Sequence, residues 1–402
     1  MKNLSCLLIL LLSSACFAQD TIYSIDTIVN KTKEVEQIDA IELFFKLVLP
    51  KKIRGGDSAH SKPRKIDIAM LPSLSYTLQT GIALGFMNSY AFYTSKNSNL
   101  SSIIFHGTYS QMRQTIFYVQ QNVFTKNNSW NLLGDWRYLK YPTPTYGLGG
   151  YSKEADITQL DYSYVRLYEW ILKKINNNLY AGAGFCLDYH WNVKELGAPN
   201  ASLAEYGLPA QKLSSGWAVN IQYDERKNSL NPTNSRYAHI VYRDNSTFFG
   251  SDENWQSILI DLRSFTRLPA KSKNVLAFWS YNNLTLSGKP PYLDLPANQW
   301  DTYSNTSRGY IQGRFRGPGM IDFETEYRMV LTKNGLLGVV AFANIQSYSD
   351  WKTPFKFDKW LPGGGVGLRL KISKVSNINV SVDYGFGIDG SHGFFFNLGE
   401  VF

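Results

Sequence analysis

The chain has 402 residues and a formal net charge of +9, and aromatic side chains make up 15% of it. Two of its three cysteines lie in the first 16 residues, so Cys186 stands alone in the rest and an internal disulfide framework is excluded. A positive charge of this size can serve nucleic acid, but no complete RNA-binding strand motif accompanies it. Basic residues that face anionic lipid head groups or line a lumen explain the charge better, so we expect no nucleic-acid partner.

The first 18 residues have the pattern of a signal peptide. Lys2 supplies the positive start, an apolar core runs from Leu4 to Leu12, and Cys16 and Ala18 are small residues at the positions that a signal peptidase reads. The sequence therefore predicts cleavage after Ala18 and export of the chain. A lipoprotein signal ending at Cys16 is the weaker alternative, because Ser13 stands where Leu or Val is usual. The apolar run is too short for a membrane anchor, since a spanning helix needs about 20 residues.

Residues 19–65 form a short polar lead. It has one apolar cluster at 38–49, which indicates a short helix, and a charged linker at 51–65. We favour a partly ordered periplasmic tail, and a plug or gate in the lumen of a barrel is the alternative. The segment is too short for a folded periplasmic domain of roughly 100 residues. The predicted organisation is therefore a signal peptide (1–18), this lead (19–65) and one large β-domain (66–402).

From Ile66 onward, apolar and polar residues alternate with period two. In the stretch 321–331, for example, Phe323 falls on one face while Glu324 and Glu326 fall on the other. A soluble sandwich buries such apolar faces, whereas a transmembrane barrel turns them to lipid and encloses a polar lumen. Run lengths and aromatics near the run ends favour the barrel, because membrane strands need about 9 to 11 residues and soluble strands average about 5 or 6.

We count about 16 such runs, an even number that is normal for bacterial outer-membrane barrels. They start near Ile66, Gly81, Leu100, Met112, Ser129, Ile157, Asn178, Leu213, Ser235, Glu253, Lys273, Gly319, Leu336, Gly363, Val375 and His392. Long connections at 141–155, 194–212, 287–318 and 349–362 follow odd-numbered runs, and short turns such as 333–335 follow even-numbered ones. The predicted fold class is all-β, a transmembrane antiparallel β-barrel whose long loops face outward and whose short turns face the periplasm.

The final stretch, 393–402, alternates in the same way and places Phe394, Phe396, Leu398 and Phe402 on one face. A closing strand with a terminal aromatic resembles the sorting signal that the outer-membrane assembly machinery reads by adding the strand to its own edge. We therefore expect this machinery to be a partner during biogenesis. Outer-membrane lipids are expected to surround the mature barrel.

The loop before the strand at 319–331 carries the most specific motifs. It contains Arg308-Gly309-Tyr310 and then Gly313-Arg314-Phe315-Arg316, and the strand continues with Glu326-Tyr327-Arg328. Further motifs lie at the first hairpin and in a predicted periplasmic turn: Ser75-Tyr76, Thr80-Gly81, Asp224-Glu225-Arg226 and Asn231-Pro232. In this order, and with the closing strand, the motifs resemble the BamA/TamA superfamily of outer-membrane barrels, the bacterial surface antigen family, over residues 71–402.

The resemblance implies a barrel of about 16 strands with its sixth outer loop folded into the lumen. By this resemblance Arg308 is the lumenal arginine, held by side chains of late strands. Its candidate partners, on inward faces, are Glu324, Glu326 and Asp383. Two positions depart from the family pattern, since Ser307 replaces an aliphatic residue and Asn344 an acidic one. The sequence also lacks the family's periplasmic POTRA domains, which weakens a direct transfer of the assembly function.

Enzyme motifs fit poorly. The five histidines have no metal-ligand spacing, no Gly-x-Ser-x-Gly motif occurs, and the segment 361–367 lacks the Lys and Ser/Thr of a phosphate-binding loop. We interpret this segment, LPGGGVG, as a loop that enters a strand, and His190 beside Asp188 as a polar pair in the lumen. The sequence therefore predicts no enzyme, no metal site and no cofactor.

Two functions suit such a barrel in the outer membrane of a Gram-negative bacterium. The first is assembly or translocation, in which client polypeptide or lipid is inserted or passed with the help of a weak seam between the first and last strands. Glycines near that seam would weaken strand pairing: Gly81, Gly85, Gly393 and Gly399. The second is a passive channel or structural barrel that keeps the scaffold without assembly activity.

Overall fold

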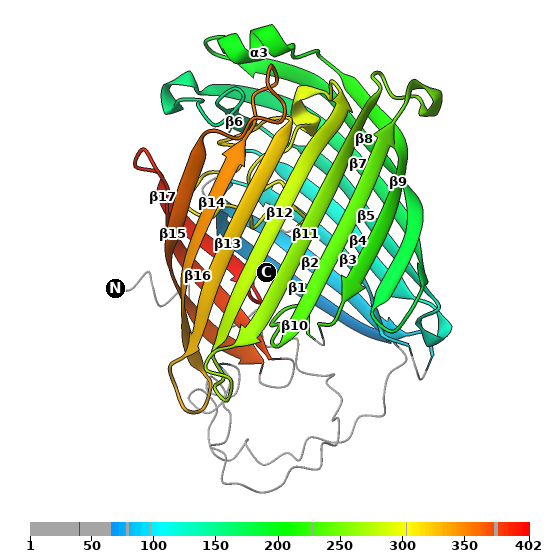
Figure 1. Ribbon diagram of the computed structural model, residues 1–402, viewed down its shortest axis with the longest axis vertical. Helices are drawn as coiled ribbons and strands as arrows, with labels where there is room; N and C mark the ends of the chain where they lie inside the picture. The colour runs from blue at the N-terminus through cyan, green and yellow to red at the C-terminus, as the bar shows by residue number, and fades with distance from the viewer. Residues whose placement is uncertain are drawn as a thin grey trace, which may run out of the picture.

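The structure is a computed structural model that describes residues 66–77, 80–95, 98–226, 228–302, 304–373 and 377–402, together with Ala40 (Figure 1). The predicted signal peptide and, apart from Ala40, the predicted lead at 19–65 lie outside the described residues. No helix in this part of the chain is long and apolar enough to cross a membrane.

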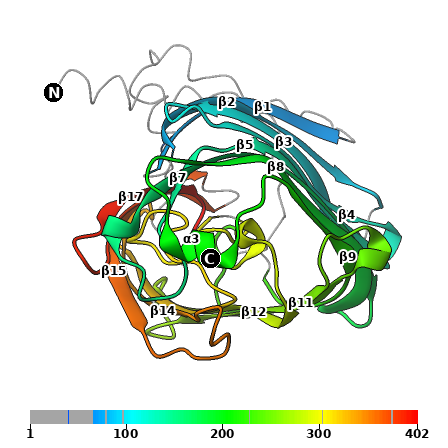
Figure 2. The ribbon, with the colours of Figure 1, turned by 90° about the horizontal axis from the view of Figure 1, so that it is seen from above.

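Consecutive strands pair antiparallel in one continuous sheet that curls into a barrel (Figures 1 and 2). The strands are β1 (Ile66–Thr77), β2 (Gly81–Tyr93), β3 (Leu100–Ser110), β4 (Thr115–Phe124), β5 (Trp130–Lys140), β6 (Thr143–Thr145), β7 (Thr158–Lys174), β8 (Leu179–Leu196), β9 (Lys212–Asp224), β10 (Ser235–Asn245), β11 (Trp255–Arg267), β12 (Val275–Gly288), β13 (Gly319–Val330), β14 (Leu337–Tyr348), β15 (Trp360–Ser373), β16 (Ile378–Phe386) and β17 (His392–Leu398). The short β6 continues β5 after a break at Pro142, since both pair with β7. The 17 strands therefore occupy about 16 positions around the barrel, which confirms the predicted architecture.

The alternation of side chains gives the barrel a polar interior and an apolar outer surface. Along β13, Asp322, Glu324, Glu326 and Arg328 are buried, whereas Phe323 between them is 46% exposed. The same pattern of exposed apolar and buried polar residues recurs along β8, β14 and β16. Apolar side chains thus cover the outer wall, where a transmembrane barrel meets lipid, and polar side chains fill the lumen. A soluble sandwich would show the opposite distribution.

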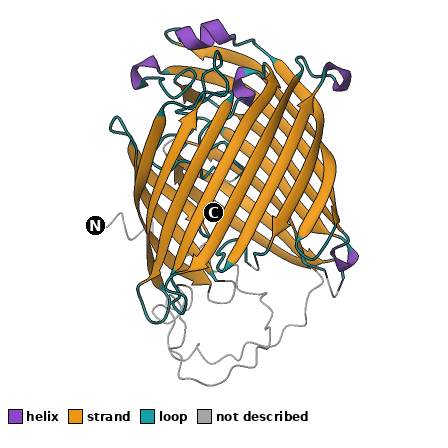
Figure 3. Ribbon diagram, in the orientation of Figure 1, coloured by secondary structure: helices purple, strands orange, loops and turns teal. Residues whose placement is uncertain are grey.

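The two ends of the barrel differ in the length of their connections. Four short helices, η4 (Glu154–Asp156), α3 (Ala201–Tyr206), η5 (Thr247–Phe249) and η6 (Tyr292–Asp294), lie in the longer loops at the upper end in Figure 3. The fifth, η3 (Lys126–Asn128), lies in a short turn at the lower end. We call these the long-loop end and the short-turn end. As the sequence predicts, the long connections that follow odd-numbered runs lie at one end and the short turns that follow even-numbered runs lie at the other.

The last four residues depart from the predicted closing strand. Phe394 and Phe396 of β17 face outward, at 47% and 40% exposed, as expected. Phe402 was expected on the same face, and that expectation is wrong, because the chain turns inward at Gly399, whose φ is +97°. The main-chain N–H of Glu400 then donates to the carbonyl of Leu230 at 2.7 Å. The side chain of Leu398, the fourth predicted member of this face, lies outside the described part.

Phe402 ends inside the lumen instead. It is 2% exposed, its ring centroid lies 5.1 Å from that of Trp279 and 6.4 Å from that of Phe265, and both partners are buried side chains of β12 and β11. Its main-chain oxygen accepts a hydrogen bond from Arg328 at 2.7 Å. The tail at 399–402 therefore packs inside the lumen and does not extend the outer wall.

Phe402→Ala is expected to lower the free energy of unfolding by about 3 kcal/mol, because it leaves a cavity between two aromatic side chains. The measurement is urea unfolding of protein refolded in detergent micelles, followed by tryptophan fluorescence, which avoids any effect of the residue on sorting in the cell. Phe394→Ala, which removes a ring from the outer wall, is the matched control. An equal loss in the two variants would contradict the inward placement of the tail.

Candidate functional site: the sixth loop and its arginine cluster

The connection between β12 and β13, residues 289–318, is the sixth long-loop connection and lies inside the barrel (Figure 2). We call it loop six. Near the long-loop end its first part packs into a buried cluster, to which it contributes Tyr292 and Leu295. Farther in, Tyr310 and Phe315 are each 1% exposed. Loop six thus contributes apolar side chains to the interior along its length.

Arg308 is the most deeply held charge of loop six. Its side chain is 1% exposed, and its Nη2 lies 2.5 Å from Glu326 Oε1 and 3.5 Å from Glu324 Oε2. Its Nη1 donates to Asp383 Oδ2 at 2.5 Å, and the guanidinium stands 3.8 Å from the centroid of the Phe342 ring. The structure therefore brings Arg308 together with all three of the candidate acids. A charge at this depth needs such partners, because an unpaired ion away from water is very costly.

Two further arginines, Arg328 of β13 and Arg369 of β15, support the same carboxylates. Arg328 Nε donates to Glu326 Oε2 at 2.8 Å, and Arg369 Nη1 donates to Asp383 Oδ1 at 2.5 Å. Glu400 joins both arginines, with its Oε2 at 2.7 Å from Arg369 Nε and 3.7 Å from Arg328 Nε. We call this group the arginine cluster. Its members are Arg308, Arg328, Arg369, Glu324, Glu326, Asp383 and Glu400.

Ser307 and Asn344, the two residues singled out as departures in the sequence, both help to hold the chain at Arg308. Ser307, at φ 62°, donates its N–H to Glu324 Oε1 at 2.6 Å and its hydroxyl to Asp322 Oδ2 at 2.5 Å. Asn344 Nδ2 donates to the main-chain oxygen of Arg308 at 2.9 Å. An aliphatic residue at 307 would leave Asp322 without the hydroxyl, and an acid at 344 would repel that oxygen. Each of the two residues therefore suits its own contact.

Glycines make room for this part of loop six against the wall. A Cβ on Gly309, whose φ is +114°, would lie 2.5 Å from the Phe386 carbonyl oxygen. A Cβ on Gly385 would lie 2.8 Å from the Gly309 nitrogen, and one on Gly363 would lie 2.4 Å from Asn344 Oδ1. Only glycine permits such close approach of two backbones.

The interpretation of 361–367 as a loop is wrong, because the segment belongs to β15 and pairs with both of its neighbours.

The other residues of the loop-six motif serve different contacts. The hydroxyl of Tyr310 donates to the Pro362 carbonyl at 2.5 Å. Arg314 Nη2 donates to the Ser152 carbonyl at 3.0 Å, in the loop before β7. Arg316 stays within loop six, where its Nη1 donates to three carbonyls around η6, and Gly313 adopts a φ of +73°. Arg314 and Arg316 therefore brace loop six near the long-loop end and do not join the arginine cluster.

A second polar anchor of loop six was not predicted. Asp294 of η6 accepts a hydrogen bond from the Ser214 hydroxyl at 2.5 Å, and its Oδ1 lies 3.5 Å from His190 Nδ1. The indole of Trp255 donates to the same serine at 3.1 Å. The sequence signal was the polar pair His190 and Asp188 on an inward face, but nothing in the spacing pointed to a partner about 100 residues away.

The molecule is a transmembrane barrel whose lumen holds a loop through a buried arginine. The structure is similar to BamA from Haemophilus ducreyi lacking POTRA domains 1-3, with a TM-score of 0.56 and 13% identity over 84% of this chain and 70% of that one. It is also similar to CdiB from Acinetobacter baumannii, with a TM-score of 0.53 and 13% identity over 83% of this chain and 59% of that one.

CdiB from Escherichia coli is a third match, with a TM-score of 0.51 and 8% identity over 84% of this chain and 63% of that one. The chain therefore spans less than two thirds of the length of either CdiB structure. No family model matches the sequence, and no curated protein matches it. At these identities the likeness shows the fold alone, which is the barrel fold that the sequence predicts.

Arg308→Ala is expected to lower the free energy of unfolding by about 3 to 5 kcal/mol, the range for removing one partner of a buried ion pair. It leaves Glu326 and Asp383 buried with less positive charge. The measurement is urea unfolding of the refolded barrel, together with the gel shift between heated and unheated samples. Arg314→Ala, which removes hydrogen bonds to Ser152 and contacts with the Tyr146 and Phe315 rings but no ion pair of the cluster, is the matched control. If the two variants lose the same stability, the arginine cluster does not hold loop six.

Asp294 gives a prediction on pH. Burial, reinforced by the charge of Asp188, raises the pKa of Asp294 to about 7. Because this pKa exceeds its ordinary value of about 3.9 in an unfolded chain, Asp294 adds stability that is complete below about pH 4 and is lost as the pH rises through 7. Between about pH 5 and pH 8 the wild type should therefore lose stability relative to Asp294→Asn. Urea unfolding at a series of pH values measures this, and a constant difference would contradict the assignment.

Proposed function

We propose that this protein is an outer-membrane barrel that assists the insertion or passage of polypeptide or lipid, and that loop six closes its lumen in the resting state. Three observations support the proposal. The fold is similar to that of BamA and CdiB, the interior holds a latched loop, and the first and last strands meet at an incomplete seam. The proposed location is the outer membrane of a Gram-negative bacterium, with the long-loop end outside and the short-turn end in the periplasm.

The seam is the observation that carries the proposal. Every neighbouring pair from β1 to β17 forms an antiparallel ladder, but the described residues form no ladder between β17 and β1. These two strands are nevertheless close in space. β17 has seven residues and β1 has twelve, so β17 is too short to cover the whole edge of β1. A strand edge with unpaired N–H and C=O groups is a template on which a client strand can pair.

The ion pairs of Arg308 with Glu326 and Asp383, which we call the latch, support the same role. A passive pore needs an open lumen, whereas loop six places buried aromatic and charged residues across this one. A lumen closed by a loop leaves the seam as the route by which a client strand would enter the membrane. We propose that outer-membrane lipids and a client polypeptide or lipid are the partners in this step.

Closing the seam tests the proposed function. In a Cys186→Ser background, cysteine pairs are introduced across β1 and β17 and oxidised in liposomes that contain the refolded protein. The control is a pair at Phe278 and Thr325, which are register partners on β12 and β13. The uncrosslinked protein should speed the folding of an eight-stranded client barrel into the liposomes, and the seam crosslink should abolish this effect while the control crosslink preserves it. Unchanged client folding in all samples would refute the proposal.

The passive-channel alternative predicts a different result. In a planar bilayer it gives large, steady currents, and those currents persist when Arg308→Ala releases the latch. The proposed function instead predicts small, flickering currents that grow in this variant, because loop six then leaves the lumen more often. Large steady currents from the wild type, without any effect on client folding, would make the protein a pore.

A further inference from the structure

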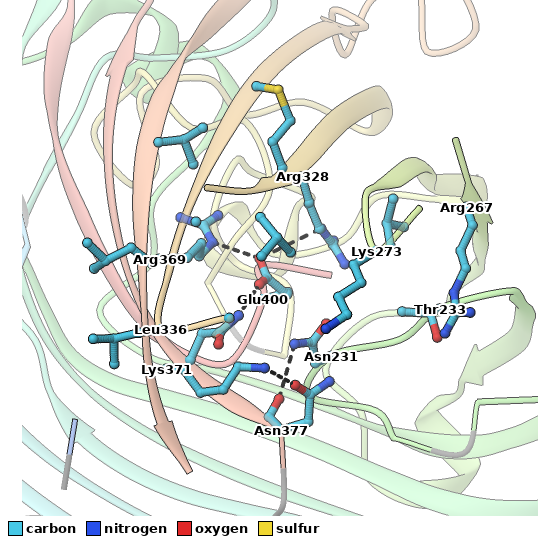
Figure 4. Close-up of a pocket in the computed structure, with 18 residues that line it drawn as sticks. Asn231, Thr233, Arg267, Lys273, Arg328, Leu336, Arg369, Lys371, Asn377 and Glu400 are labelled. Atoms are coloured by element: carbon cyan, nitrogen blue, oxygen red, sulfur yellow. Dashed lines mark hydrogen bonds and ion pairs between the residues drawn. The ribbon is translucent and has the colours of Figure 1, made fainter. Parts of the chain in front are cut away.

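A pocket opens into the lumen at the short-turn end and is separate from the part of the lumen that loop six fills. It holds about 350 Å³, within the range of small-ligand sites. The pocket is lined by four hairpins, at the β9–β10, β11–β12, β13–β14 and β15–β16 connections, together with the tail after β17. Figure 4 shows that Lys273 and Lys371 reach toward its centre from opposite sides.

The charge of the lining is strongly positive. Five cations and one carboxylate contribute to it: Arg267, Lys273, Arg328, Arg369, Lys371 and Glu400. The amide side chains of Asn231, Asn377 and Asn379 also line the pocket, and two of them already donate one hydrogen bond within its wall, Asn231 to the Asn377 carbonyl and Asn379 to Glu400. Arg328 and Arg369 are balanced by the acids of the arginine cluster, but Arg267 and Lys273 form no ion pair with any described residue. The mouth of the pocket therefore carries positive charge that no described acidic residue neutralises.

The pocket wall also contains a buried hydrogen-bond donor without an acceptor. Arg328 is 6% exposed, and its buried Nη1 has no hydrogen-bond partner among the described residues. Its other terminal nitrogen, Nη2, is taken by the Phe402 oxygen. A buried guanidinium N–H without a partner costs free energy, so such a group marks a place where an acceptor is missing.

Glu400 shows what kind of acceptor the wall accommodates. Its carboxylate takes a hydrogen bond from Arg369 Nε at 2.7 Å and one from Asn379 Nδ2 at 2.7 Å, and it lies 3.7 Å from Arg328 Nε. One wall of the pocket thus already binds an oxyanion, supplied by the chain's own tail. Arg267 and Lys273 have no such carboxylate among the described residues.

We propose that this pocket binds a small, multiply charged anion of the phosphate class, either free or as the head group of a lipid. Phosphate oxygens accept several charge-assisted hydrogen bonds at once, which suits arginine, lysine and amide donors that converge from four hairpins. A volume of about 350 Å³ admits a diphosphate or a sugar phosphate and is too small for a folded partner. The proposal goes beyond the assembly role and stands or falls without it.

Calorimetric titration of the refolded full-length mature chain with inorganic pyrophosphate tests the site. Arg267→Ala with Lys273→Ala should weaken binding by about tenfold or more, since two charge-assisted contacts are removed. Both side chains are exposed, so the variant should keep its fold, which the gel shift on heating verifies. Lys126→Ala with Lys173→Ala is the matched control, because it removes the same charge from exposed residues outside the pocket and should leave the affinity unchanged.

Glu400→Gln tests the sign of the effect. Removing the internal carboxylate should tighten pyrophosphate binding by about threefold or more, because the anion no longer meets a like charge. A weaker affinity in this variant, an equal loss in both double variants, or no binding at about 1 mM pyrophosphate would overturn the proposal.

The source of the phosphate is distinguished in nanodiscs. If the natural ligand is a lipid head group, nanodiscs with phosphatidylglycerol should weaken pyrophosphate binding relative to zwitterionic ones, and the Arg267 and Lys273 variant should lose this competition. If the ligand is a free anion, both kinds of nanodisc should give the same affinity. Either result supports the phosphate site and assigns its source.

Discussion

A guanidinium buried inside a membrane barrel is the constraint on which the rest of this structure depends. Arg308 is 1% exposed, so its charge has to be matched by carboxylates that approach it from the wall. Glu326 of β13 and Asp383 of β16 do so directly, and they in turn need Arg328 and Arg369 to limit their mutual repulsion. The result is a closed group of ion pairs that joins loop six to three strands.

The same constraint explains two features that look unrelated. The glycines of β15 and β16 let the loop-six backbone come close enough for the Arg308 side chain to reach its partners. The inward turn at Gly399 brings Glu400 within 2.7 Å of Arg369 and lets the tail support the cluster from below. The glycines leave these strands without side chains at the points of contact, and the turn at Gly399 takes the tail out of the outer wall. In each case a charge in the lumen gains a partner, which offsets the high cost of burying it alone.

Sequence reasoning predicted the strands because period two persists over whole membrane crossings, and the same phase placed Glu324, Glu326 and Asp383 on inward faces. It could not choose among these acids, and the structure uses all three. It also missed the inward path of Phe402, since a reversal at one glycine does not disturb the alternation of the residues around it. Arg369 and Glu400 were missed for another reason: their proximity depends on strand register across the barrel, which no local pattern encodes.

The position of Glu400 links the latch to the pocket below it. This carboxylate belongs to the arginine cluster, and it also lines the short-turn pocket. An anion in the pocket competes with Glu400 for Arg328 and Arg369, and any movement of those arginines changes the charge that Glu326 and Asp383 offer to Arg308. If anion binding shifts the equilibrium of loop six by some factor, thermodynamic linkage requires that release of loop six shifts the anion affinity by the same factor. The proposed ligand site and the arginine cluster therefore share three charged residues, Arg328, Arg369 and Glu400.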